Sequence, residues 1–242
     1  MKPFIVMPTY NEKENIERIV REILALGTGV SVLIVDDNSP DGTGEIADGL
    51  SRELNGQVFV EHREGKQGLG TAYRHGFKVA LDKGADCVFE MDADFSHNPT
   101  YVPDFMAAIE KHDVVIGSRY VPGGGTEDWG IMRKVISRGG SLYARILTGL
   151  KIKDATGGFR CYRREVLESI DFSRISASGY AFQVEMAYVC TIMGFDVYEL
   201  PIVFVDRTAG TSKMSKSIIF EAVGLVAGLK KKYRDLNKNK RL

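Results

Sequence analysis

Two pairs of acidic side chains stand where apolar segments of the sequence end. Asp36 and Asp37 follow the run VSVLIV, and Asp92 and Asp94, separated by Ala93, follow the run CVFEM. Two carboxylates at positions i and i+2 in a turn after a strand can converge on one divalent ion, and Mg²⁺ or Mn²⁺ completes its oxygen shell with water and substrate phosphates. The alternative is a pair of solvated turn acids. The second acidic pair nearby favours a metal site that binds a nucleotide diphosphate.

Basic side chains that suit phosphate groups occur in three later segments. Arg119 follows another apolar run, and Arg133 and Ser137 are spaced i, i+4, so that they share one face of a predicted helix. An arginine beside a hydroxyl is a good receptor for a phosphate. Arg207 and Lys213 flank the loop TAGTS, which can fold over a diphosphate. Taken singly, Arg119 and Arg133 are each more typical of a solvated surface arginine than of a phosphate site.

The elements that must position these residues alternate through the first half of the chain. Short β-branched runs recur about every 25–30 residues, with amphipathic helical patterns between them. Such βαβ units predict an α/β fold with a mainly parallel, twisted sheet and flanking helices. Right-handed crossovers then bring the carboxyl ends of the strands to one edge, where a ligand is expected. The predicted strands are 4–7, 30–35, 58–61, 87–91 and 113–118, and the predicted helices are 14–26, 41–54, 71–83 and 99–111.

After residue 120 the pattern changes. The segment VPGGGTEDWG is Gly-rich and is expected to be a lid or mobile loop. Helical patterns follow over 133–147 and 180–193, and a strand is predicted over 196–205.

Composition excludes several classes of protein. The 242 residues carry 32 Lys and Arg against 32 Asp and Glu, so no overall field attracts nucleic acid. GxGxxG is absent after the first predicted strand, and no GxxxxGK[ST], GxSxG or HExxH motif occurs. The three cysteines are widely spaced, which fits a reducing compartment. A signal peptide and a spanning segment are also missing, so a cytoplasmic protein is expected.

The end of the chain differs in charge from the rest. Residues 228–242 hold seven Lys and Arg against one acid, Asp235. The helical pattern before this tail predicts an in-plane amphipathic helix attracted to anionic lipid. A helix packed on the rest of the chain or on a partner is the alternative, and a solubilising terminus is another for the tail. We therefore expect a domain over 1–214 and an amphipathic helix with a basic tail over 215–242. The residues on the apolar face of the helix are Ile218, Ala222, Leu225, Val226 and Leu229.

Taken together, the motifs resemble one family. The motifs that carry the resemblance are PTYNE (8–12), VDDNSPDGT (35–43), HREGKQGLGTAY (62–73), MDADFSHNP (91–99), GSRY (117–120), DATGGFRCYRR (154–164), GYAFQVE (179–185) and ELPIVFVDRTAGTSKM (199–214). In this order and spacing they resemble the dolichol-phosphate mannose synthases, which are inverting glycosyltransferases of family 2 with the GT-A fold.

The resemblance implies an activity and a set of site residues. A member of this family transfers mannose from GDP-mannose to a dolichyl or other polyprenyl phosphate, with inversion, at the cytoplasmic face of a membrane. The donor's guanosine would be held by Pro8, Tyr10, Glu12, Val35 and Asp37. The metal and diphosphate would be held by Asp92, the Ala93 backbone and Asp94, with Arg207 and Lys213 closing over the phosphates. The acceptor phosphate would be bound by Arg119, Arg133 and Ser137.

Alternatives within and outside the family remain open. UDP-glucose is the leading alternative donor, and a UDP-aminosugar or a soluble saccharide acceptor follows it. A nucleotide-sugar-binding regulatory subunit without turnover is a different class. Some family members dock to a small membrane partner, which this chain could also use. For Glu185 and Asp154, a structural or sugar-positioning role is favoured over that of a base.

Overall fold

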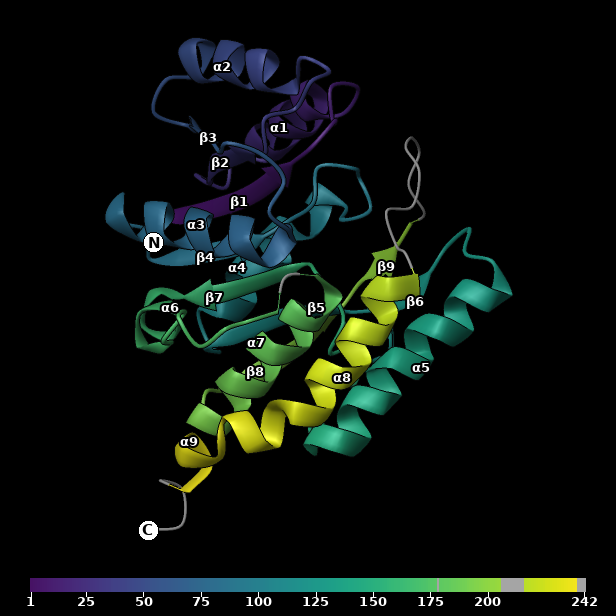
Figure 1. Ribbon diagram of the computed structural model, residues 1–242. Helices are drawn as coiled ribbons and strands as arrows, with labels where there is room; N and C mark the ends of the chain where they lie inside the picture. Colours follow the sequence, from purple (N-terminus) through teal and green to yellow (C-terminus); the bar gives the residue numbers. More distant parts are fainter. Residues whose placement is uncertain (178, 206–215, 239–242) are drawn as a thin grey trace.

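The computed structural model describes residues 1–177, 179–205 and 216–238 (Figure 1). Its strands are β1 (Pro3–Thr9), β2 (Ser31–Asp36), β3 (Val58–His62), β4 (Cys87–Glu90), β5 (Val114–Ser118), β6 (Gly125–Thr126), β7 (Arg160–Arg163), β8 (Val197–Pro201) and β9 (Val203–Phe204). Its helices are α1 (Ile16–Ala25), α2 (Thr43–Glu53), α3 (Leu69–Asp82), the 3₁₀ helix η1 (Pro99–Tyr101), α4 (Val102–Ile109), α5 (Ile131–Thr148), α6 (Arg164–Ser169), α7 (Tyr180–Met193), α8 (Lys216–Lys232) and α9 (Arg234–Lys238).

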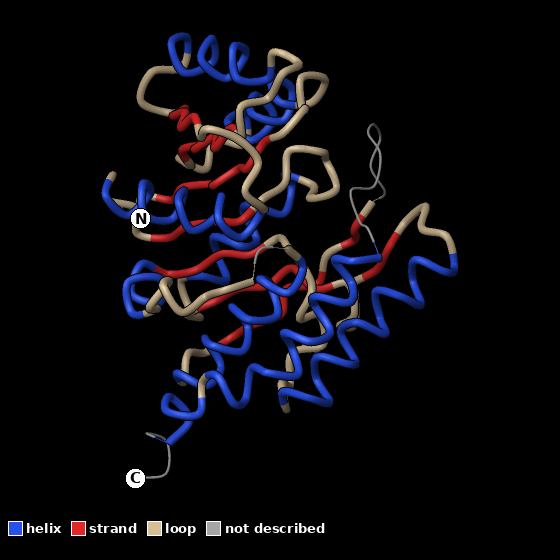
Figure 2. The backbone as a smooth tube through the Cα atoms, in the orientation of Figure 1, coloured by secondary structure: helices blue, strands red, loops and turns tan. Residues whose placement is uncertain are grey.

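A seven-stranded sheet in the order β3-β2-β1-β4-β7-β5-β8 forms the centre of the described structure. Neighbouring strands are parallel except where β7 pairs with β4 and with β5. Helices flank the strands in Figure 2. The predicted α/β class with a mainly parallel sheet is thus confirmed. Because β1, β2, β4 and β5 run in the same direction, the loops that follow them meet at one edge of the sheet.

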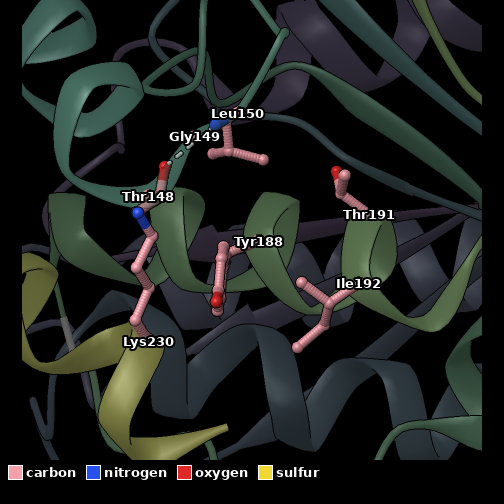
Figure 3. Close-up of a pocket in the computed structure, with 7 residues that line it drawn as sticks. All are labelled: Thr148, Gly149, Leu150, Tyr188, Thr191, Ile192 and Lys230. Carbon is pink, nitrogen blue, oxygen red and sulfur yellow. Dashed lines mark hydrogen bonds between the residues drawn. The ribbon is translucent and has the colours of Figure 1, made fainter. Parts of the chain in front are cut away.

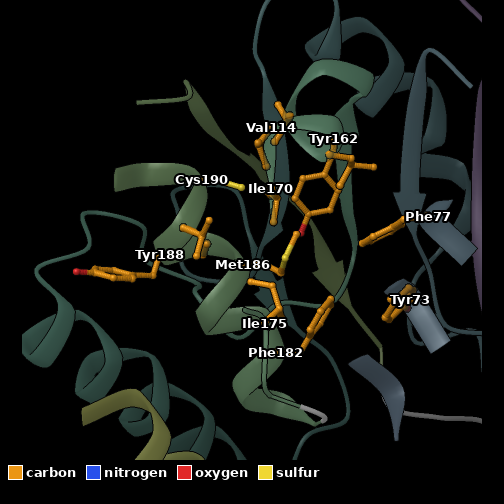
Figure 4. Packing of buried hydrophobic residues seen from close by; sticks show 14 of the residues in the cluster. Tyr73, Phe77, Val114, Tyr162, Ile170, Ile175, Phe182, Met186, Tyr188 and Cys190 are labelled. Atoms are coloured by element: carbon orange, nitrogen blue, oxygen red, sulfur yellow. The ribbon is translucent and has the colours of Figure 1, made fainter. Parts of the chain in front are cut away.

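Two cores lie on opposite faces of this sheet, because successive residues of a strand point to opposite faces. Phe4 and Val6 of β1 pack with α3 and α7, whereas Ile5 and Met7 pack with α1, α2 and α4. Figure 4 shows the first of these cores, in which aromatic side chains of α3 and β7 meet α7. On this face α3 lies so close to β1 that a Cβ at Gly76 would collide with Val6. Both faces of β1 and β2 are therefore fixed by packing.

The Gly-rich segment 121–130, predicted to be a lid or mobile loop, contains the short strand β6, which pairs in parallel with β9. Gly123 takes a left-handed conformation with φ of +88°, which glycine adopts without steric penalty. Gly124 lies so close to the carbonyl of Ser118 that a Cβ there would collide with it. These glycines allow the segment to turn back against the end of β5.

The C-terminal helices pack on the rest of the chain. Figures 1 and 2 show α8 lying along α5 and α7. Val226 and Leu229 of α8 are buried in the same core as α7. The side chains of Ile218 and Ala222, on the same predicted apolar face, lie outside the described residues.

A fully buried carboxylate, Glu185 of α7, anchors these helices. It accepts hydrogen bonds from the backbone N–H groups of Ser176 (3.1 Å) and Ala177 (3.0 Å). It also accepts from the Tyr233 hydroxyl (2.9 Å) and the Lys232 ammonium (2.6 Å). Burial and the negative charge of Glu185 raise the pKa of Tyr233, so its hydroxyl stays protonated and donates. This geometry gives Glu185 a structural role.

Candidate active site

The turn after β4 places Asp92 and Asp94 at the carboxyl edge of the sheet. The Tyr73 hydroxyl, buried on α3, donates to Asp92 Oδ1 (3.1 Å), and the Asp92 N–H donates to His97 Nδ1 (3.0 Å). The Ser96 N–H donates to Asp94 Oδ1 (3.1 Å). Asp94 is buried, whereas Asp92 is half-buried. Both carboxylates are therefore held in place by bonds from neighbouring groups before any ligand binds.

The chemistry of this pair fits a hard divalent cation. Among the residues that the structure describes, no group of three or more His, Cys, Asp and Glu side chains is arranged to hold a metal ion. Mg²⁺ is commonly bound by only one or two carboxylates, with waters and substrate phosphates as the other ligands. Asp92 and Asp94 supply such a pair of oxygen ligands.

A buried polar layer lies beneath the Asp92–Asp94 turn. Gln183 Nε2 donates to Glu90 Oε2 (2.6 Å), while Glu90 Oε1 and Gln183 Oε1 have no partner among the described residues. Burial raises the pKa of Glu90 to about 7. Arg160, also fully buried, donates to the carbonyls of Ala155, Gly157 and Gln183. This layer joins β4, β7 and α7 directly behind the acidic turn.

The ends of β1 and β2 bring together the residues predicted to hold the nucleoside. Pro8 and Val35 are register partners on these strands. Tyr10 follows β1, and Lys66 lies over its ring, with Nζ 4.9 Å from the centroid. Glu12 lies in the same loop, and its backbone N–H donates to Thr43 Oγ1 (2.9 Å). The structure thus gathers the predicted residues on neighbouring strand ends.

Asp37, the fifth of these residues, is paired with an arginine that the sequence analysis did not single out. Arg63 donates from Nε to Asp37 Oδ1 (2.6 Å) and from Nη2 to Oδ2 (2.9 Å). Its Nη1 donates to Thr71 Oγ1 (2.9 Å). Both partners are buried, so the charge of Asp37 is compensated within the protein. Arg63 directly follows β3 and lies in the quoted motif HREGKQGLGTAY (62–73), and these two features were the signals that the sequence offered.

Arg119, expected to bind an acceptor phosphate, is engaged by Asp154. Its Nε and Nη2 donate to the two carboxylate oxygens (2.6 and 2.7 Å), and Nη2 also donates to Thr156 Oγ1 (3.0 Å). Asp154 is fully buried and therefore needs a partner of opposite charge. Arg119 thus enters the site as one half of an ion pair.

Aromatic side chains connect Arg119 with Arg133. Trp129 contacts both, with its ring centroid 5.4 Å from the Arg119 guanidinium carbon and 4.2 Å from that of Arg133. Phe204 of β9 meets the Trp129 ring edge to face, with centroids 5.3 Å apart, and meets His97 in the same way at 5.7 Å. The rings thereby link the predicted acceptor side to the acidic turn. Trp129, Phe204 and His97 were not singled out from the sequence, although all three lie in or beside quoted segments.

Ser137 joins the same cluster through Tyr120. The Tyr120 hydroxyl donates to Ser137 Oγ (2.7 Å), and the Arg138 guanidinium lies 5.6 Å from the Tyr120 ring centroid. Thus Arg119, Arg133 and Ser137, which are separated in the sequence, surround one group of rings. Arg207 and Lys213, predicted to close over the diphosphate, lie outside the described residues.

A cavity of about 240 Å³ lies elsewhere, at the far end of α5 (Figure 3). It is lined by Thr148, Gly149, Leu150, Tyr188, Thr191, Ile192 and Lys230. Because α5 spans 18 residues, its two ends are about 27 Å apart. None of the predicted site residues that the structure describes lines this cavity, so it is separate from the candidate site.

Comparisons with known proteins bear on this site. The sequence profile of glycosyl transferase family 2 matches residues 4–171. The chain is 45% identical over 227 residues to a polyprenol monophosphomannose synthase of Mycolicibacterium smegmatis, covering 93% of this chain and 86% of that protein. It is 45% identical over 223 residues to an undecaprenyl-phosphate mannosyltransferase of Micrococcus luteus, covering 92% and 91%.

A solved structure shows the same fold. Glucosyl-3-phosphoglycerate synthase from Mycobacterium tuberculosis, in complex with Mn²⁺, UDP and glucosyl-3-phosphoglycerate, matches with a TM-score of 0.64 at 18% identity. The match covers 98% of this chain and 80% of that chain. The predicted GT-A fold is confirmed.

Proposed function

The chain belongs to glycosyl transferase family 2, and from that premise we propose that it transfers mannose from GDP-mannose to a polyprenyl phosphate. The names of the two bacterial relatives support both the sugar and the class of acceptor. The observation in the structure that supports this proposal best is the connection between two groups of side chains. The acidic Asp92–Asp94 turn and the Arg119–Trp129–Arg133 cluster meet through His97 and Phe204.

The reaction needs little acid–base assistance from the protein. An acceptor phosphate oxygen attacks the anomeric carbon, a new carbon–oxygen bond forms there, and the bond from that carbon to the GDP oxygen breaks with inversion. A phosphate dianion is already nucleophilic near neutral pH, so catalysis rests on positioning and on electrostatic stabilisation. Mg²⁺ or Mn²⁺ bound by Asp92 and Asp94 would offset the charge on the departing diphosphate.

Each side of the site then has a separate task. Asp37, held by Arg63, presents its carboxylate beside the ends of β1 and β2. There the carboxylate would accept hydrogen bonds from the N–H or O–H groups of a guanosine. The cluster around Trp129 carries positive charge, which suits an anionic acceptor. We extend the proposal to Arg207 and Lys213 as groups that contact the donor phosphates.

A membrane surface is the partner that would present a polyprenyl phosphate, and α5 is the element we propose to dock on it. Its outward side exposes large apolar residues, of which Ile131 is 83% exposed. Apolar surface of this extent beside basic residues is typical of helices that lie in a lipid interface. Arg133 and Lys134 in the first turns of α5 and Lys230 on α8 suit anionic headgroups. The exposed apolar residues of α5 are Ile131, Met132, Val135, Ile136, Leu142 and Ile146.

Crossing a bilayer is a separate question from docking on one. Within the described ranges, the structure contains no helix with the length and apolar character that a membrane span requires. We also propose that the basic tail, residues 228–242, and a small membrane subunit contribute to docking.

A donor panel tests the proposed reaction. Purified protein with Mg²⁺ or Mn²⁺ and a short-chain polyprenyl phosphate is supplied with radiolabelled GDP-mannose, UDP-glucose or UDP-N-acetylglucosamine. We expect label to enter the organic phase from GDP-mannose alone, and the matching polyprenol without phosphate to accept none. Label from UDP-glucose instead would replace the proposed donor. Tight donor binding without transfer from any donor would favour a regulatory subunit.

A further inference from the structure

A buried hydrogen-bond donor in the candidate site has no acceptor among the residues that the structure describes. Trp129 is 7% exposed, and its indole Nε1 is buried without a hydrogen-bond partner among the described residues. Buried polar groups in folded proteins are rarely left unpaired, because desolvation of an N–H group must be offset by a hydrogen bond. An orphan donor at this position therefore indicates a ligand that supplies an acceptor atom.

The surroundings of the indole define the class of that ligand. The Arg133 guanidinium lies over the ring at 4.2 Å and that of Arg119 at 5.4 Å, while the Phe204 ring meets it edge to face. Asp154 compensates the charge of Arg119. An oxyanion that accepts from Nε1 would also lie close to the charge of Arg133. The ligand chemistry that fits this environment is a phosphate.

The start of α5 adds to the same environment. Gly130, the residue before the helix, has an extended conformation and no side chain that could cap the first turn. The N–H groups at a helix N-terminus and the helix dipole favour an anion there. Ile131 and Met132, the first residues of the helix, are strongly exposed and apolar. A ligand whose phosphate lies at Trp129 and whose hydrocarbon chain lies over Ile131 and Met132 would contact complementary groups at both places.

We propose that the Trp129 indole N–H donates a hydrogen bond to the phosphate of the polyprenyl acceptor, which makes Trp129 a residue that selects phosphorylated lipids. This inference rests on the proposed function, because it assigns a further residue to the acceptor side of that reaction. Trp129 fixes the phosphate between Arg133 and the start of α5, and the chain of the acceptor continues along the exposed face of that helix.

The sequence offers a direct probe, because Trp129 is the only tryptophan of the chain. Protein labelled with ¹⁵N gives a single indole N–H signal in a proton–nitrogen correlation spectrum. We expect a short-chain polyprenyl phosphate to move this signal to lower field in a saturable way. The corresponding prenyl alcohol, and GDP with Mg²⁺, should leave it in place. An indole signal that stays in place while backbone signals show that the prenyl phosphate binds would overturn the proposal, as would a shift with GDP alone.

A variant gives an independent measurement. Trp129→Phe keeps an aromatic ring beside the two arginines and removes the N–H group. We expect the KM for prenyl phosphate to rise about tenfold with the KM for donor unchanged, since a hydrogen bond to a charged group is worth about one power of ten or more in affinity. Tyr198→Phe on β8, outside the site, is the matched control. An unchanged acceptor KM in Trp129→Phe would overturn the assignment.

These outcomes separate the inference from the proposed function. If the wild-type protein transfers mannose but the indole signal does not respond to the acceptor, the proposed function stands and the role of Trp129 is wrong. If the prenyl phosphate neither binds nor accepts sugar, both are wrong.

Discussion

The two sides of the candidate site hold their charges in different ways. At the β1, β2 and β4 ends, Asp36 accepts from Thr9 and Ser39, and Asp92 accepts from Tyr73, so carboxylates are fixed by hydrogen bonds within the protein. On the β5 and α5 side, Arg119 is held by an ion pair with Asp154, and Arg133 lies over the ring of Trp129, whose Nε1 has no hydrogen-bond partner among the described residues.

This difference has consequences for how each side responds to change. Fixed carboxylates do not need a ligand to take their positions, so the acidic side is organised in advance. According to our proposal, the Trp129 N–H on the acceptor side would gain its hydrogen-bond acceptor when the phosphate of the lipid binds. Substitutions on the acidic side should therefore act on turnover and donor binding, whereas those on the acceptor side should act on the acceptor, the membrane or the stability of the fold.

The largest effect is expected at the acidic turn. Asp94→Asn removes the negative charge that would bind the metal, and we expect the rate of transfer to fall by about a thousandfold, as when a major electrostatic contact to a transition state is lost. EDTA should abolish transfer by the wild type, and Mg²⁺ or Mn²⁺ should restore it. Asp104→Asn, on the exposed first turn of α4, is the control. Full activity in EDTA would contradict a role for metal.

Breaking the buried ion pair should act on stability. Asp154→Asn leaves the Arg119 guanidinium buried without its counter-charge, and we expect the free energy of unfolding to fall by about 3 kcal/mol. Urea titration followed by circular dichroism measures it. Glu22→Gln, which breaks an exposed pair with Arg18, should cost less than about 1 kcal/mol. If the free energy of unfolding falls as little in Asp154→Asn as in Glu22→Gln, Asp154 is not needed to compensate the charge of Arg119.

The exposed face of α5 should govern binding to lipid. Replacing both Ile131 and Val135 with Ser removes apolar surface that we expect to enter the interface, and partitioning onto anionic liposomes should fall about tenfold. Co-sedimentation with the purified protein alone also tests whether a membrane subunit is required. Changing Lys240 and Arg241 of the tail to Gln is the parallel variant. If only the tail variant releases the protein, the tail is the anchor and α5 is not.

The smallest effect is expected at the nucleoside side. Arg63→Lys keeps the positive charge beside Asp37 but cannot make two parallel hydrogen bonds to it. We expect the KM for GDP-mannose to rise about threefold to fivefold, with the KM for acceptor unchanged. Arg52→Lys, at the exposed end of α2, serves as control. A change in acceptor KM alone would show that the two sides are not independent.

A comparison of α5 with α8 shows the limit of sequence patterns. A stripe of apolar residues on a helix indicates a buried face but does not state what covers it. In α8, Val226 and Leu229 are buried in the core that also contains α7. By contrast, α5, from which the sequence analysis selected only Arg133 and Ser137, exposes a row of apolar residues. Which helix meets protein and which is left uncovered depends on how the elements dock.

The sequence alone determined the alternating strands and helices, the mainly parallel sheet and the positions of Asp37, Asp92 and Asp94 at its carboxyl edge. These features follow from local periodicity and from the handedness of βαβ units. Only the tertiary structure decided which charges pair. Arg63 reaches Asp37 and Arg119 reaches Asp154 across 26 and 35 residues of chain. Such contacts depend on the packing of whole elements, and no short stretch of sequence specifies that packing.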